Sequence, residues 1–374
     1  MGRFNFSNTA LLTVLPLSLL LIALLFNSVA VYAKPDNGSG STIEISNGIL
    51  TVYVENETGF GIGSYTICTG PNHPAPDKNV FYGGSVGSAW SSYNTIVVNE
   101  TKRMYVTTSY KEIIPDPNYT VICLDENLTS IHHTNRIVVI KWRTDENLFI
   151  TQEIEILGST IHDTYVRVTV SIKNEGSQKY TVGIRYLWDI MIADNDGSWL
   201  RTVNPSSNWL SSETDWLPPD FSYWEATDNP NNPTFTIYGS ISEPSWLRIP
   251  ATPPKGFMFA AWGGGSNPNP GLYDYAYSFS HLARTIADSN LDSAVAYYWE
   301  KKIDVGENWS VTAYLCTSPP LPPPVGGFII DSDLSITNHS WTLHINSLAI
   351  LTLLLSATIL TIVSYKSKFR KRKQ

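Results

Sequence analysis

The chain has 374 residues, of which 43% are apolar and 16% charged, so its composition is that of a folded protein rather than a disordered one. All 33 acidic residues lie between Lys34 and Trp341, whereas seven of the 25 basic residues lie outside that span. The span therefore carries 33 acidic against 18 basic residues, a net charge of −15. Such a surface repels phosphate backbones and argues against nucleic acid as a partner.

The N-terminus has the pattern of a secretory signal. Arg3 precedes an apolar run over residues 10–26, and Val31-Tyr32-Ala33 places small residues at −3 and −1 of a cleavage site after Ala33. We therefore predict a signal peptide over residues 1–33. An uncleaved signal anchor is the alternative, because the run is long enough to span a bilayer. Both interpretations export the residues that follow.

A linker over residues 34–41 leads into a predicted β domain over residues 42–317, in which apolar residues alternate with a period of two. In its first half, strands are expected at residues 43–54 (a hairpin broken at 46–48), 64–69, 95–98, 104–108, 121–124, 136–142 and 149–157. No segment sustains a 3.6-residue repeat beyond a turn or two; residues 281–287 come nearest.

The strongest alternation lies at the centre of this domain. Residues 166–172 and 180–190 alternate on either side of Asn174-Glu175-Gly176, so we predict two long strands paired as a hairpin. The second strand ends in a polar turn at residues 194–197. Another strand is expected at residues 257–262, and a last hairpin pairs residues 294–299 with 309–317.

Residues 198–255 contrast with this pattern, since only 234–238 and 246–249 look extended. We predict ordered loops packed over one end of the sheets. They carry five tryptophans and five acids: Trp199, Trp209, Trp216, Trp224 and Trp246, with Glu213, Asp215, Asp220, Glu225 and Asp228. Aromatic faces stack on sugar rings, so these tryptophans with Glu213 and Asp215 form a candidate ligand site. The favoured alternative is that they seal the end of the sandwich, because buried area is what Trp most often contributes.

The strand pattern predicts an all-β fold, a large two-sheet antiparallel sandwich. The first hairpin with residues 59–63, the Asn-x-Gly turn at 174–176, and the segments 182–185, 194–197 and 292–295 resemble features of prokaryotic, archaeal-type membrane-anchored surface proteins. Their layout is similar to the β-supersandwich of the galactose-mutarotase-like superfamily, over most of residues 42–317. The resemblance concerns strand order and turns. No matching histidine and glutamate set is present to carry over, so it implies the fold and not mutarotase activity.

The turn after the second central strand is a candidate cation site. Asp194 and Asp196, with Asp189 nearby, offer the oxygen ligands that Ca²⁺ prefers. A simple turn is the favoured alternative, because Asp, Asn and Gly are the residues that turns select. No other cofactor is expected. Zinc is disfavoured because His132 and His133 are adjacent and would point to opposite faces of a strand.

The C-terminus has the pattern of a membrane anchor. A proline-rich run opens a predicted stalk over residues 318–342, and Pro-Val-Gly-Gly within it resembles the C-termini of archaeal envelope proteins. A transmembrane helix is predicted over residues 343–365, followed by a basic tail at 366–374. Positive charge stays on the cytoplasmic side, so we expect a single-pass protein of the cell membrane with its ectodomain outside.

Export makes further chemistry relevant. Seven Asn-x-Ser/Thr sequons are candidate glycosylation sites: Asn37, Asn56, Asn99, Asn118, Asn127, Asn308 and Asn338. Cys68, Cys123 and Cys316 are too few for a disulfide scaffold. Either one pair is bonded or all three are reduced, and the sequence leaves both open.

These features predict a surface-anchored glycoprotein with a non-catalytic role in envelope structure, adhesion, or recognition of a glycan or another envelope protein. The alternative is a surface carbohydrate-active enzyme, a hydrolase, lyase or epimerase-like protein that uses the loop acids and tryptophans. A third interpretation is an accessory subunit of a membrane complex, which Asn346 within the span would support.

Overall fold

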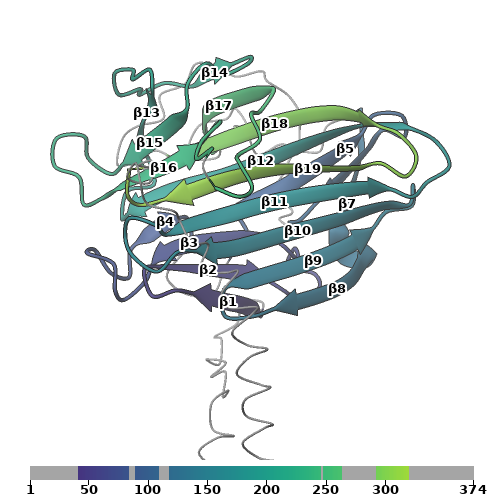
Figure 1. Ribbon diagram of the computed structural model, residues 1–374, viewed down its shortest axis with the longest axis horizontal. Helices are drawn as coiled ribbons and strands as arrows, with labels where there is room; N and C mark the ends of the chain where they lie inside the picture. The colour runs from purple at the N-terminus through teal and green to yellow at the C-terminus, as the bar shows by residue number, and fades with distance from the viewer. Residues whose placement is uncertain (1–40, 84–88, 109–117, 246, 263–291, 320–374) are drawn as a thin grey trace, which may run out of the picture.

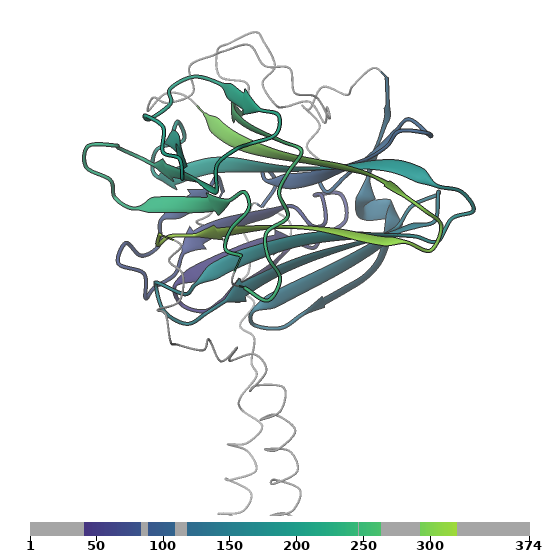
Figure 2. The same ribbon diagram turned by 45° about the horizontal axis from the view of Figure 1, so that its top comes forward.

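The computed structural model describes residues 41–83, 89–108, 118–245, 247–262 and 292–319. These residues form nineteen strands and a short 3₁₀ helix, η1 (Leu124–Asn127), arranged as two facing sheets (Figures 1 and 2). The predicted all-β, two-sheet sandwich is therefore confirmed. The predicted signal peptide, stalk, transmembrane helix and tail lie outside the described residues, apart from residues 318 and 319. Within the described part of the chain, no helix is long and apolar enough to cross a membrane.

The larger sheet has eleven strands, with β12 at its centre. Its strands are β1 (Thr42–Ser46), β2 (Leu50–Glu55), β3 (Tyr65–Thr69), β4 (Asn79–Phe81), β5 (Tyr93–Val98), β6 (Arg103–Val106), β7 (Thr120–Cys123), β12 (Tyr180–Ala193), β14 (Thr214–Trp216), β17 (Gly256–Ala261) and β18 (Ser293–Ile303). The order is β1-β2-β3-β4-β12-β18-β17-β14, and β5, β6 and β7 branch from β12. Only the β6–β7 pairing is parallel among the described strands.

The smaller sheet has eight strands in the order β13-β15-β16-β19-β11-β10-β9-β8. Its strands are β8 (Leu128–His133), β9 (Ile137–Arg143), β10 (Leu148–Leu157), β11 (Tyr165–Asn174), β13 (Trp199–Val203), β15 (Tyr223–Thr227), β16 (Thr236–Ser240) and β19 (Asn308–Cys316). The predicted hairpins β1–β2 and β9–β10 and the predicted strands β5 and β6 are confirmed. β4 and β8 were not predicted.

The two hairpins predicted around β11–β12 and β18–β19 are wrong. β11 pairs with β10 and β19 in one sheet, whereas β12 pairs with β18, β5 and β4 in the other. Each predicted turn is a crossover between the sheets, and the two crossovers bind each other. The Asn174 amide donates to the Glu307 carbonyl at 2.9 Å, and the Gly306 amide donates to the Asn174 carbonyl at 2.7 Å. Alternation reveals which face of a strand is buried, but not which strand lies beside it.

Residues 198–255 contain more sheet than predicted. They form β13, β14, β15 and β16, while residues 247–249 form no strand. Each of these strands has five residues or fewer. Strands this short show too few alternating residues to be recognised from the sequence, because prolines and tryptophans lie between them.

The main core lies between the sheets. Even-numbered residues of β12, including Tyr186 and Trp188, face inward and pack against aromatic residues of β18 and β15. A second apolar cluster, which contains Leu187, lies on the other face of the larger sheet. Odd-numbered residues of β12 therefore point away from the smaller sheet. That outer face carries the candidate site.

Candidate functional site

Three carboxylates converge at one end of the β12–β18 pair. Asp189 lies near the end of β12, Asp196 in the turn that follows it, and Asp292 immediately before β18. Antiparallel pairing places Ile190 opposite Ser293, which brings the three residues to one place. One carboxylate oxygen from each lies within 4.8 Å of those of the other two. We call these three residues the carboxylate centre.

Two of the three residues that the sequence suggested as cation ligands lie together in the structure. The sequence grouped Asp189 with Asp196, and the structure brings these two together. Asp194 is outside the carboxylate centre: its side chain is 91% exposed and forms an ion pair with Lys78 at 3.9 Å. Asp292 was not predicted as a ligand, because it is distant in sequence and only the β12–β18 register places it beside Asp189.

Hydrogen bonds hold the turn that carries Asp196. Ala193 adopts a φ of +56°. On either side of it, Ile192 and Asn195 exchange two backbone hydrogen bonds of 3.0 Å. The backbone carbonyl of Asp196 then accepts hydrogen bonds from the Ser293 amide at 2.9 Å and from its hydroxyl at 3.0 Å. The turn is thus fastened to the start of β18, which fixes where Asp196 lies relative to Asp292.

The carboxylate centre has one buried member, Asp189, and two partly exposed ones, Asp196 and Asp292. Asp189 is only 1% exposed, and the Oδ1 atoms of all three residues have no hydrogen-bond partner among the described residues. Burial, and then the charge of Asp196, raise the pKa of Asp189 well above its ordinary value. Burial and the neighbouring acids likewise raise the pKa of Asp292. Burial raises the pKa of Asp196 to about 6.

Aromatic side chains border the carboxylate centre. The Tyr82 amide donates to the Asp189 carbonyl at 3.1 Å, and the Trp262 amide donates to the Asp292 carbonyl at 3.0 Å. Trp90 connects the two rings edge-on, with centroid distances of 5.8 Å to Tyr82 and 6.3 Å to Trp262. Tyr82 is 36% exposed, and burial followed by the three acids raises its pKa. The site thus combines oxygen donors with an aromatic ring that solvent reaches.

The tryptophans predicted to bind a ligand do not have a common environment. Trp224 is fully buried and donates to the Tyr297 hydroxyl at 2.6 Å, and Trp216 packs against Phe257 of the core. Trp199 is partly exposed, and Trp246 lies outside the described residues. The positions of Trp224 and Trp216 agree with the alternative in which tryptophans seal the sandwich.

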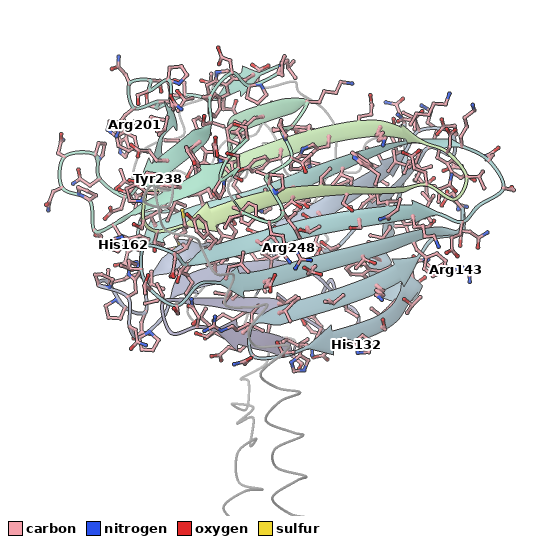
Figure 3. All side chains as sticks on the ribbon, viewed as in Figure 1. His132, Arg143, His162, Arg201, Tyr238 and Arg248 are labelled. Carbon is pink, nitrogen blue, oxygen red and sulfur yellow. The ribbon has the colours of Figure 1, made fainter. Side chains whose placement is uncertain are left out.

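Trp209 belongs to a separate polar network. The Arg201 guanidinium lies 4.5 Å from the Trp209 ring centroid and forms an ion pair with Glu225, which is buried. Burial and then Glu225 raise the pKa of Tyr238 to about 12. Figure 3 shows Arg201 and Tyr238 near each other. Because Glu225 is ion-paired with Arg201, its carboxylate has a structural role.

The remaining acids and the histidines are dispersed. Glu213 is buried, and Asp215 lies on β14 opposite Met258. His132 lies on β8, far from His162 (Figure 3). The acids predicted around the tryptophans therefore contribute nothing to the carboxylate centre.

The structure leaves all three cysteines unpaired, with Cys68 and Cys316 buried and Cys123 partly exposed. Burial raises the pKa of each thiol to about 12. Among the sequons, Asn118 and Asn308 are exposed, Asn56, Asn99 and Asn127 are partly buried, and Asn37 and Asn338 lie outside the described residues.

No protein-family model and no curated protein matches the sequence. Among solved structures, the fold is similar to a putative aldose 1-epimerase from Escherichia coli K12, with 12% identity, a TM-score of 0.40 and coverage of 74% of this chain and 98% of that one. It is also similar to a galactose mutarotase related enzyme from Lactobacillus acidophilus, with 8% identity, a TM-score of 0.42 and coverage of 75% and 100%. At these values, the similarities assign neither a family nor an activity to this chain. Its own fold and site define a two-sheet β-sandwich with a partly buried carboxylate centre on the outer face of the larger sheet.

Proposed function

We propose that the protein is an exported, single-pass surface glycoprotein whose β-sandwich has a non-catalytic recognition role toward a glycan or another envelope protein. The observation that carries the proposal is the form of the carboxylate centre. Its oxygens lie within 4.8 Å of one another and Asp189 is 1% exposed. Glycoside hydrolysis needs two carboxyl groups on either side of the scissile bond, at separations of roughly 5–10 Å. Because Asp189 is buried, this group of acids suits binding better than that reaction.

The sequence supports the location part of the proposal. The acidic middle of the chain lies between an N-terminal export signal and a C-terminal apolar segment with six basic residues after it. Five sequons lie on the described sandwich, and Asn118 and Asn308 are exposed there. Exposed acceptors fit a domain that passes through a secretion pathway.

Tyr82 is the side chain through which a ligand would be recognised. It is exposed and its ring borders the carboxylate centre. Aromatic rings bind the apolar faces of sugars and of peptide side chains by stacking. Arrays of glycans and of peptides from envelope proteins, probed with the full-length chain in detergent, test this. We expect saturable binding to one class of ligand and no release of sugar from it.

Two variants make the test specific. Tyr82→Ala is expected to weaken binding about tenfold, since loss of one stacking contact costs of the order of 1 kcal/mol or more. Val305→Ala is the control, because Val305 is exposed and lies just beyond the far end of the long strand β18. Equal binding by wild type and Tyr82→Ala would show that Tyr82 does not take part in recognition. Turnover of the bound glycan would contradict the non-catalytic role.

One observation favours a second candidate function, a surface carbohydrate-active enzyme. Burial raises the pKa of Asp196 to about 6, the range in which a carboxylic acid serves as a general acid near neutral pH. This candidate predicts that the full-length chain releases reducing sugar or unsaturated products from a polysaccharide. It further predicts that Asp196→Asn abolishes release while Asp194→Asn, in the same turn, retains it. Binding without products on every polysaccharide tested would exclude it.

A further inference from the structure

We propose that Asp189, Asp196 and Asp292 bind one Ca²⁺ ion. This inference concerns the carboxylate centre itself and stands independently of whether the protein recognises a glycan or another protein. It replaces Asp194, which the sequence suggested, with Asp292, which the strand register places at the site.

The first argument is the distance between the donors. Three atoms that all lie within 4.8 Å of one another have a point no more than about 2.8 Å from each. Calcium–oxygen bonds in proteins are roughly 2.3–2.6 Å long, so one Ca²⁺ ion reaches all three residues with small side-chain movements at most. The donors come from three separate segments, which leaves other coordination positions around the ion for water.

The second argument concerns hydrogen bonding rather than the distance between the donors. The Oδ1 atom of Asp189 lies in a side chain that is 99% buried, and no described residue bonds it. The hydroxyl of Ser91 is fully buried and lies beside Asp189. Buried polar atoms are normally satisfied, and leaving each one unpaired costs about 1–3 kcal/mol.

The charge balance makes the same point. No basic side chain of the described part of the chain pairs with Asp189, Asp196 or Asp292; Lys78 pairs with Asp194 instead. Buried charges in proteins are paired with opposite charges or coordinate metal ions. When these acids ionise, a divalent cation would supply the compensating charge that no described basic residue gives them.

The donor chemistry selects the ion. All three ligands are carboxylates, the hard oxygen donors that Ca²⁺, Mg²⁺ and Mn²⁺ prefer, whereas zinc and copper sites draw on His and Cys. Mg²⁺ requires near-ideal octahedral geometry at roughly 2.0–2.1 Å and retains several waters. Three protein ligands whose oxygens lie up to 4.8 Å apart fit the longer and more variable distances of Ca²⁺ better.

A bound ion would join parts of the fold that are far apart in sequence. It would cross-link the end of β12, the turn at residues 194–197 and the start of β18. Tyr82 borders the same place, so the ion would also lie beside the exposed ring.

Isothermal titration calorimetry of the EDTA-treated full-length chain in detergent tests the proposal. With CaCl₂ as titrant we expect saturable binding of one ion per chain, and MgCl₂ at least about tenfold weaker binding. Differential scanning fluorimetry on the same samples should show a melting temperature that rises with Ca²⁺ concentration, because the ion binds only the folded chain.

Matched variants locate the ion. Asp189→Asn and Asp292→Asn should each weaken Ca²⁺ binding at least about tenfold and abolish the thermal shift, since each removes one charged ligand. Asp194→Asn, in the same turn but outside the carboxylate centre, should bind within about twofold of wild type. The Asn variants remove mutual repulsion between buried acids, so they should fold without metal. Asp196→Asn in the partly exposed turn provides a further variant should one of them fail.

Three outcomes overturn the proposal. One is the absence of saturable Ca²⁺ binding by the wild type up to about 10 mM, which is above the range of weak extracellular sites. The second is binding that survives both Asp189→Asn and Asp292→Asn, because the acidic surface would then hold the ion. The third is a loss of Ca²⁺ affinity in Asp194→Asn as large as that in Asp189→Asn and Asp292→Asn. That result would place the ion at the turn with Lys78.

Discussion

At the scale of single residues, Glu55 shows how the burial of an acid makes folding stability depend on pH. It ends β2, is 3% exposed, and its Oε1 accepts hydrogen bonds of 3.0 Å from the amides of Asn56 and Glu57. Burial nevertheless raises the pKa of Glu55 to about 7, because desolvation outweighs these two bonds. In the unfolded chain the same group titrates near 4.5.

The first prediction follows from this difference. The folded state holds its proton up to pH 7 while the unfolded state loses it near pH 4.5, so folding stability falls as pH rises through that window. The loss is about 3 kcal/mol at most. Glu55→Gln keeps an oxygen for both amides but cannot ionise. We expect urea unfolding to show that the variant gains stability relative to wild type between pH 4.5 and pH 8.

The exposed acid Glu44, on the neighbouring strand β1, supplies the control. Glu44→Gln should leave the slope of stability against pH as it is in the wild type. A Glu55→Gln variant that keeps the wild-type slope would show that Glu55 ionises normally in the folded protein, contrary to the burial argument.

The carboxylate centre shows what the sequence could and could not predict at this scale. Asp189 and Asp196 are seven positions apart in one segment, so their proximity was predictable from the strand and the turn after it. Asp194 looked equivalent to Asp196, because residue type does not reveal which side chain of a turn points to solvent. Asp292 required knowledge of the partner of β12, which local pattern does not contain.

At the scale of elements, the fold depends on close contacts between strands as well as on alternation. Trp224 of β15 lies opposite Gly239 of β16, and a Cβ atom at Gly239 would be 2.1 Å from Cε2 of Trp224. The indole therefore covers the glycine, and its Nε1 donates to Tyr297 of β18 in the other sheet. This pair connects the two sheets through one buried side chain.

The second prediction uses this contact in a double-mutant cycle. Gly239→Ala should destabilise the fold by roughly 1–3 kcal/mol through overpacking, and Trp224→Leu by roughly 3–5 kcal/mol through lost burial. In the double variant the new methyl group meets the smaller leucine, so the combined loss should be at least about 1 kcal/mol less than the sum. Chemical unfolding of the four proteins measures the coupling. Strict additivity would mean that the indole does not cover Gly239 in solution.

Strands and strand pairings differ in how far the sequence predicts them. The long strands β9, β10, β11 and β12 alternate clearly, and each was expected close to its observed bounds. The pairing of β9 with β10 was also predicted, but the partners of β11 and β12 were not, because a tight polar connection such as Asn174-Glu175-Gly176 serves equally for a hairpin and for a crossover. The choice between a hairpin and a crossover depends on the contact between the two crossovers, which joins residues far apart in the chain.

At the scale of the whole molecule, export and anchoring remain predictions, and the described surface makes them testable. Glycan transfer requires a sequon whose amide projects into solvent. Asn118 and Asn308 are exposed, whereas the Oδ1 atom of Asn56 is buried and that of Asn99 accepts a hydrogen bond from the Tyr119 hydroxyl at 3.0 Å. The sequons are therefore unequal, although the sequence makes them look alike.

The third prediction concerns this difference. Glycopeptide mass spectrometry of the chain purified from its native cells should find glycan at Asn118 and Asn308 and none at Asn56. Asn308→Gln should remove one glycan mass and change the melting temperature little, because the residue is exposed at the start of β19. Full occupancy at Asn56 with an unmodified Asn308 would contradict the exposure of these two side chains.

The fourth prediction concerns the orientation of the whole chain. Six of the last nine residues are basic, and basic residues next to a membrane span are retained on the cytoplasmic side. An epitope added after Gln374 should therefore resist protease applied to intact cells and be degraded once the membrane is permeabilised. An antibody against the sandwich should label intact cells, which separates correct insertion from failure to reach the membrane. Replacing all six basic residues by serine removes the charge that retains the tail, so the fraction of accessible epitope should rise while sandwich labelling persists. An epitope digested on intact wild-type cells would place the tail outside and reverse the orientation on which the recognition role depends.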